Sequence, residues 1–183
     1  DYSLADSIPD GTGQDESMDL LAAAVPVRVV EWYQKLIRMV GWKLSAMAPA
    51  SSAISNLIMS DQGKQDVRRS NCCVMDCGRQ GVRLYFYQKG LLFAKRGLEF
   101  CDTEERLLFE LEKIWDYYQT CYPGYIPELI YVTGGKRNPL LEAAITEQLE
   151  AECCDWTKLL DNSQEPVRGL ISAEAAGITF WKG

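Results

Sequence analysis

A carboxylate followed by two glycines is the feature of this sequence best suited to phosphate chemistry. Asp76 ends an apolar run, and Gly78 and Gly81 follow it within the segment DCGRQG. Glycine permits backbone conformations in which successive N–H groups turn towards an anion, and a carboxylate at a strand end can face a metal ion. Asp76 has a second reading as a plain cap of the turn that follows, and the sequence leaves both readings open.

A second glycine corner lies further along the chain. An apolar strand expected to end at Thr133 runs directly into Gly134 and Gly135, and Asn138 is a natural N-cap for a helix with Pro139 in its first turn. A helix start presents unpaired N–H groups and a partial positive charge, so this order is a generic cradle for an anion or a nucleotide. Joints of this kind are also common as simple tight turns, and both alternatives stand.

The composition limits the remaining classes of function. The 183 residues carry a formal net charge of −7, from 26 acidic and 19 basic side chains, and no histidine. Such a surface repels a phosphate backbone, so nucleic-acid binding is disfavoured, and the usual general base is missing. Seven cysteines without paired C-x-x-C knuckles fit a reducing cytoplasm better than a metal site. No apolar run approaches the ~20 residues of a membrane span and the start lacks signal-peptide features, so we expect a soluble chain.

Three short strands should position the first corner. They are expected over residues 71–76, 82–88 and 91–96, with Lys89-Gly90 as a hairpin tip because Gly tolerates the positive φ of such turns. Neighbouring strand residues point to opposite faces, so the adjacent cysteines of the first strand should divide between the two faces.

Helices and strands should alternate after this ribbon. Asp102, with Glu105 three residues on, resembles a capping box and predicts a helix start. The helix should end at the turn around Gly124. The elements expected beyond it are a strand at 128–133, a helix from Pro139 to about 148, a strand at 152–156 and a helix at 169–181.

The first sixty residues predict a smaller unit. Pro26 should open a helix that Gly41 ends, with apolar residues at helical spacing that we assign to the core. The polar stretch 60–70 is the best candidate for a boundary or exposed loop. The other expected elements are strands at 1–7, 18–25 and 42–47 and a helix at 50–59; four tryptophans in apparent elements are assigned as core or interface anchors, Trp32, Trp42, Trp115 and Trp156.

From residue 71 onward the order of elements resembles the ribonuclease-H-like half-domain that occurs twice in the actin and sugar-kinase superfamily. VMDCGRQGVRLYFY is similar to the second phosphate motif of that superfamily, and IYVTGGKRNPL to its adenosine motif. The resemblance implies ATP and Mg²⁺ as possible ligands of the intact protein, although no cofactor is predicted for this chain and no residue is predicted to be catalytic or to bind a metal. The nucleotide contacts that the resemblance implies are Asp76, Gly78, Arg79, Gly81, Thr133, Gly134 and Gly135.

The N-terminal part resembles the PilM family of type IV pilus assembly proteins. This resemblance rests on MDLLAAAVPVRVVEWYQKLIRMVGWKLSAMAPASSAISNLI and on the hairpin LYFYQKGLLFAKRGLEF. It implies an actin-like α/β fold, with a small α+β subdomain and connecting helix at 1–60 and a mixed sheet flanked by helices at 71–183. It also implies a cytoplasmic scaffold, peripheral at the inner face of the cell membrane, with a groove for the cytoplasmic N-terminal tail of a PilN-like membrane protein and possible self-association. FtsA and GspL share this architecture and remain alternatives.

Two departures weaken the expectation of an ATP-hydrolysing enzyme. The first phosphate motif of the superfamily, an Asp-x-Gly strand pair, should precede everything present here, and this chain starts too late to contain it. Arg79 and Gln80 stand where small or hydroxyl residues normally let the γ-phosphate approach. Their bulk should obstruct a nucleotide, although Arg79 has the alternative of pairing with a phosphate. We therefore expect a scaffold, with a nucleotide-binding ATPase or kinase as the alternative.

Overall fold

The computed structural model describes residues 2–4, 20–22, 24–44, 47–59, 67, 70–99, 103–125 and 127–160. The chain divides into two compact units, residues 1–49 together with residue 183, and residues 50–182. The helix expected at 169–181 and nearly all of the polar stretch 60–70 lie outside the described residues.

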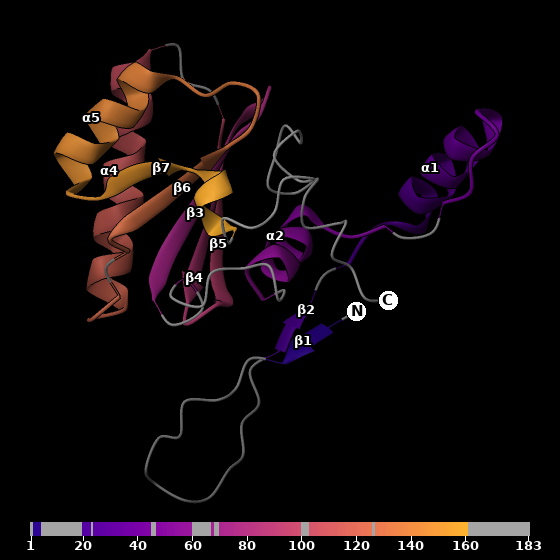
Figure 1. Cartoon of the computed structure of the whole chain (residues 1–183), viewed down its shortest axis with the longest axis horizontal. Coiled ribbons are helices and arrows are strands. Elements are labelled where there is room, and N and C mark those ends of the chain that lie inside the picture. The colour runs from indigo at the N-terminus through magenta and orange to yellow at the C-terminus, as the bar shows by residue number, and fades with distance from the viewer. Residues whose placement is uncertain are drawn as a thin grey trace, which may run out of the picture. The chain divides into compact units, whose positions relative to one another are not determined.

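The second unit is built on a five-stranded mixed sheet with the order β5-β4-β3-β6-β7 (Figure 1). The first three strands form an antiparallel ribbon, and β6 and β7 then run parallel to β3. This is the strand order of the ribonuclease-H-like half-domain, so the expected fold class is confirmed. The strands are β3 Asn71–Cys77, β4 Gly81–Gln88, β5 Leu91–Glu99, β6 Leu129–Thr133 and β7 Glu152–Asp155.

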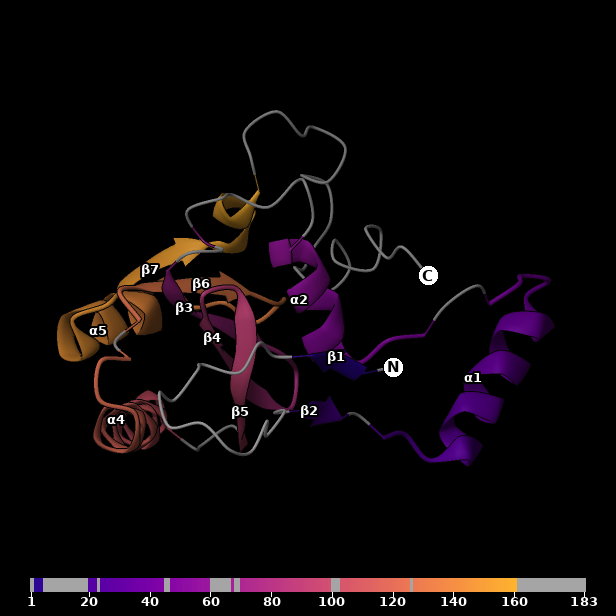
Figure 2. The same cartoon turned by 90° about the horizontal axis from the view of Figure 1, so that it is seen from below.

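Helices cover both faces of this sheet, as Figure 2 shows. One core cluster joins the sheet to α4 (Glu104–Cys121) and α5 (Pro139–Leu149), and the other joins it to α2 (Ala50–Met59) and the 3-10 helix η1 (Trp156–Leu159). Strand alternation divides the side chains between these clusters. Within β3, Cys73 lies in the first cluster and its neighbour Cys72 in the second, as expected, and both are fully buried.

Turn and cap residues define most element ends as the sequence predicts. Lys89 and Gly90 both have positive φ, 50° and 80°, at the tip of the β4–β5 hairpin. The side chain of Asn138 accepts a hydrogen bond from the Leu140 N–H at the start of α5. The prediction for α4 was wrong by one residue, because its N-cap is Thr103, whose hydroxyl accepts from the backbone N–H three residues on.

The end of β7 also differs from its expected position. The strand stops at Asp155, whereas Trp156 begins η1. The reason is local: the Asp155 carboxylate accepts hydrogen bonds from the backbone N–H and hydroxyl of Thr157, which caps the 3-10 turn and ends the extended run.

The first unit contains a two-stranded antiparallel sheet and one helix. Strand β1 (Tyr2–Leu4) pairs with β2 (Leu20–Ala22), and α1 spans Val27–Met39 after Pro26. Both strands lie within the ranges expected for them.

The predicted third strand of this unit was wrong. Of its residues, 42–44 and 47 are described, and none of these is in a strand. The Trp42 N–H instead donates to the carbonyl of Ile37 and the Gly41 N–H to that of Arg38, a paired arrangement that closes the C-terminus of α1. The Trp42 backbone therefore serves the helix cap rather than a strand ladder.

The prediction of a buried face holds for one helix and fails for the other. In α2 the residues Ala53, Ile54, Leu57 and Ile58 are fully buried, whereas α1 has no buried residue at all. The same division holds for the tryptophans: Trp115 and Trp156 are buried anchors, and Trp32 and Trp42 are exposed.

Candidate functional site

The two glycine corners lie at the same end of the sheet. Strands β3 and β6 are parallel neighbours, and Asp76 stands opposite Thr133 in their register. The chain leaving each strand therefore passes the other: the Lys136 N–H donates to the carbonyl of Cys77 over 3.0 Å. Gly134 is so close that an added Cβ would overlap the Cys77 carbonyl and lie 2.8 Å from Asp76 Oδ1. The structure thus brings the two glycine corners together at the carboxyl ends of these strands.

Asp76 is closed off within this cluster. Its exposed fraction is 4 %, and Oδ2 lies 2.7 Å from Arg83 Nη2, a close ion pair without the angles of a hydrogen bond. Asp76 and Arg83 are cross-strand partners in the β3–β4 register, so both side chains emerge on the same face of the sheet. The other oxygen faces Gly134. The carboxylate is therefore held between a guanidinium and a glycine.

The sequence analysis did not predict the pairing of Asp76 with Arg83. Only the register of the hairpin places Arg83 opposite Asp76, and that register depends on the turn of three residues, 78–80, between β3 and β4. The alternation of β4 carries a weak signal, because Arg83 interrupts a run of buried side chains at Val82, Leu84 and Tyr85. The structure thus adds a third role for Asp76, as the partner of a cross-strand arginine.

The β3–β4 turn has a compact form of its own. The Gly78 N–H donates to the Gly81 carbonyl over 3.0 Å, so this amide is engaged within the turn. Gly81 packs against β5, where an added Cβ would overlap the carbonyl of Leu98. The absence of a side chain at Gly81 is therefore required by the approach of two strands, independently of any ligand.

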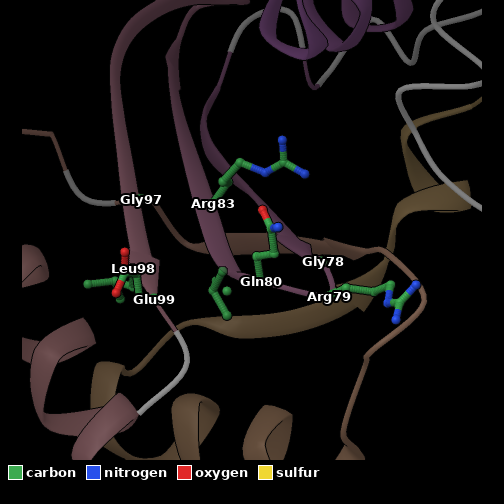
Figure 3. A pocket seen from close by; sticks show the side chains of 9 residues that line it. Gly78, Arg79, Gln80, Arg83, Gly97, Leu98 and Glu99 are labelled. Carbon is green, nitrogen blue, oxygen red and sulfur yellow. The ribbon is translucent and has the colours of Figure 1, made fainter.

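An open hollow of about 940 Å³ lies over the turn and the end of β5. Figure 3 shows the side chain of Arg79 extending from the turn and that of Arg83 from β4, with Gln80 between them. Of the expected nucleotide contacts, Gly78, Arg79 and Gly81 line this hollow, whereas Asp76, Thr133, Gly134 and Gly135 do not. The first corner thus borders an open space, and the second corner is packed against the first.

An ion-pair cluster beyond the second corner was also missed. Arg137 donates to both oxygens of Glu142, over 2.9 and 3.0 Å, and to Asp155. The hydrogen bonds that Arg137 donates to the Glu142 carboxylate are the main reason that the pKa of Arg137 lies above its ordinary value. Burial raises the pKa of Asp155, but hydrogen bonds from Thr157 and Arg137 outweigh it, so that pKa is lowered. Arg137 thus links Glu142 of α5 to Asp155 of β7, and its guanidinium is already paired beside the second glycine corner. No local signal in the sequence indicates this contact, because Arg137 and Asp155 are 18 residues apart.

The residues of the site do not fit Mg²⁺. Magnesium in phosphate sites is held through carboxylates and water, but the Asp76 carboxylate already faces a guanidinium at 2.7 Å. Within the described residues, no group of three or more Cys, Asp or Glu side chains is arranged to hold a metal ion.

Among the residues that the structure describes, no helix is long and apolar enough to cross a membrane.

Comparisons of sequence and of structure give different results. No family model and no curated protein matches the sequence. The fold matches a chain of the "PilM-PilN type IV pilus biogenesis complex" with a TM-score of 0.71 and 15% identity, over 97% of this chain and 64% of that one. An actin-like ATPase fold protein of unknown function from Bacteroides thetaiotaomicron gives a TM-score of 0.42 at 14% identity, over 57% of this chain and 38% of that one. The ethanolamine utilization protein EutJ from Carboxydothermus hydrogenoformans gives 0.46 at 14% identity, over 83% and 61%.

The first of these matches supports the fold through both units. It extends along nearly the whole chain, including the small first unit, although the chain spans less than two thirds of the structure that it matches. The chain is therefore PilM-like in fold, and its second unit has the fold of a ribonuclease-H-like half-domain.

Proposed function

We propose that this chain is a cytoplasmic actin-like scaffold of a type IV pilus or related machine, peripheral at the inner face of the cell membrane. It binds the cytoplasmic N-terminal tail of a PilN-like membrane protein. The observation that carries the proposal is the fold match to the pilus complex, which extends over 97% of the chain. The match covers the first unit as well as the half-domain. This coverage matters because a shared half-domain alone would not favour this function over others.

The β1–β2 sheet is the proposed site of the tail. Each strand contributes three paired residues, and within the described part of the chain the sheet has these two strands only. A two-stranded ribbon is marginally stable by itself, and its outer edges offer backbone groups to an extended peptide. A tail added as a third strand would gain main-chain hydrogen bonds and stabilise the ribbon.

The state of Asp76 favours a scaffold over an enzyme that turns ATP over. Its carboxylate is buried and paired with Arg83, so placing it on a metal ion or an attacking water requires breaking that pair. Nucleotide binding without hydrolysis is the second candidate. It is favoured by the hollow beside Gly78, Arg79 and Gly81, where an exposed guanidinium stands ready for a phosphate.

A titration of the tail peptide tests the scaffold. The fluorescently labelled N-terminal peptide of the PilN-like protein from the same organism should bind with saturation, and a scrambled peptide of equal composition should not. Hydrogen exchange should slow at the amides of Tyr2–Leu4 or Leu20–Ala22 and stay unchanged in β3 and β6, because strand addition protects backbone groups locally. The absence of binding at both low and moderate salt would contradict the proposal.

A thermal-unfolding series tests the second candidate separately. The midpoint is measured with ATP and EDTA, with ATP and Mg²⁺, and with buffer alone. A nucleotide held by the chain raises the midpoint by mass action, and the rise should be the same without Mg²⁺ because Asp76 is already paired. If millimolar nucleotide does not shift the midpoint, nucleotide binding is rejected and the scaffold proposal is unaffected. A shift that requires Mg²⁺ would contradict the interpretation that Asp76 is paired with Arg83 and does not bind the metal ion.

A further inference from the structure

Helix α1 presents an apolar side that none of the described residues buries. Residues 27–39 carry apolar side chains over roughly half the helix circumference at 100° per residue, and no residue of the helix is buried. The exposed fractions are 59 % for Trp32, 41 % for Leu36 and 75 % for Met39, and Trp42, just beyond the helix, is 71 % exposed. We call the apolar side of α1 together with Trp42 the α1 face.

The opposite side of the helix is basic. Residues 24–44 contain four basic and one acidic side chain, which gives the stretch a net charge of +3. The whole chain carries −7, so the remaining residues carry −10. Net positive charge is therefore concentrated in the stretch that contains α1, within an otherwise acidic protein. The charged side chains are Arg28, Glu31, Lys35 and Arg38 on the helix and Lys43 beyond its end.

We propose that α1 binds the surface of an anionic lipid bilayer, lying in the plane of the interface with the α1 face buried among the headgroups. An amphipathic helix with basic residues on one side and Trp and Leu on the other has the composition of interfacial helices. Tryptophan is enriched at this depth because its ring is apolar and its N–H is polar. At 13 residues the helix is about 20 Å long, suited to lying on a bilayer and too short to span one.

Charge complementarity distinguishes this partner from an apolar protein surface. An anionic bilayer attracts the stretch that carries +3, whereas the remaining residues, which carry −10 together, give no such attraction. A purely apolar groove would gain nothing from the four cations. The inference does not rest on the proposed function, since it needs no tail and no pilus, and it supplies a direct physical means for the peripheral location.

Vesicle co-sedimentation of the full chain tests the proposal. The chain should bind vesicles of phosphatidylcholine with one quarter phosphatidylglycerol, should bind pure phosphatidylcholine far more weakly, and should be released by raised salt. The double variant Lys35→Gln, Arg38→Gln should lower the partition coefficient about thirtyfold, since each cation near an anionic surface contributes about a fivefold effect. Matched control substitutions on α4, Arg106→Gln and Lys113→Gln, should leave it unchanged.

A second pair of variants tests the apolar contribution. Trp32→Ala with Leu36→Ala should lower partitioning at least tenfold, whereas Phe109→Ala with Leu140→Ala should not, although those two side chains are 54 % and 74 % exposed on other helices. All of these side chains are partly or largely exposed, so circular dichroism and the unfolding midpoint should remain at the parent values.

The outcomes separate the competing partners. Absence of binding to anionic vesicles, or equal losses in the α1 and control variants, overturns the proposal. The same holds if α1 variants keep vesicle binding but lose capture of the tail peptide, because the α1 face would then be a peptide site. Failure of the parent chain to bind the tail peptide, with vesicle binding intact, overturns the proposed scaffold alone.

Discussion

Substitution of Gly134 by Ala tests whether the two glycine corners meet. Gly134 has φ +95°, and an added Cβ would overlap the Cys77 carbonyl oxygen and come within 2.8 Å of Asp76 Oδ1. The Cys77 carbonyl cannot readily retreat, because it accepts the Lys136 N–H over 3.0 Å and belongs to a strand paired on both sides. The substitution therefore introduces backbone strain and a steric overlap at the same atom.

The cost of the left-handed backbone conformation can be separated from the cost of the steric overlap by substituting two other glycines. Gly124 has a similar φ of +90° with nothing within 4 Å of an added Cβ, and Gly135 has open space and no positive φ in the left-handed range. The left-handed conformation costs an L-residue about 1–2 kcal/mol, and overpacking costs about 1–3 kcal/mol more. We expect Gly134→Ala to lower the free energy of unfolding by about 3–4 kcal/mol, Gly124→Ala by about 1 kcal/mol, and Gly135→Ala by almost nothing.

Urea unfolding of the three variants, followed by far-UV circular dichroism, measures these differences. For a chain of this length the Gly134→Ala loss corresponds to a midpoint roughly 6–16 °C lower in a thermal scan. Equal losses for Gly134→Ala and Gly124→Ala would show that conformation alone accounts for the effect. The end of β6 would then not lie against the end of β3, and the site built from the two corners would be refuted.

Three further predictions concern other parts of the second unit. Arg83→Met should lower the free energy of unfolding by about 1–3 kcal/mol because it leaves the buried Asp76 carboxylate without its cation, and the added variant Asp76→Asn should restore part of the loss in a double-mutant cycle by urea unfolding. Asn138→Ala should cost about 1 kcal/mol in the same assay, since it removes the N-cap of α5. Burial raises the pKa of the Cys72 thiol to about 12, whereas Cys121 is exposed. In a thiol-reagent assay at pH 8, Cys121→Ser should therefore remove one equivalent of rapidly reacting thiol per chain, and Cys72→Ser should not.

The architecture of the second unit was predictable because its signals are local. A continuous apolar run marked β3, hydrophobic alternation marked β4, Lys89-Gly90 marked the hairpin, and the helix cap at Asn138 marked α5. The order of these elements then admits few topologies, because parallel strands joined through helices follow strict connection rules. The strand order and the placement of the glycine corners followed from that order together with the family resemblance.

The side-chain contacts of the site were harder to predict from the sequence, because they depend on strand register and on residues far apart in the chain. The pairing of Asp76 with Arg83 requires the β3–β4 register, and the fork of Arg137 joins residues on α5 and β7. The α1 helix illustrates a different difficulty. Its apolar spacing predicts a helix correctly, but spacing alone cannot tell whether the apolar side meets a core or another surface. Its excess of cations was the clue that sequence reasoning passed over.

The state of Asp76 gives a physical reason to seek the function of this protein in its first unit. A carboxylate that must hold a metal ion gains from an environment of water and other oxygens, whereas here a guanidinium and a glycine enclose it. That arrangement stabilises the end of the sheet, and releasing the carboxylate for chemistry would destabilise the corner that the glycines form. In the first unit the situation is reversed: among the residues that the structure describes, a short ribbon has no further strand at its edges and a helix has an unburied apolar side. Exposed surface of this kind costs free energy in water unless a partner covers it, so the first unit is where binding would yield the larger gain.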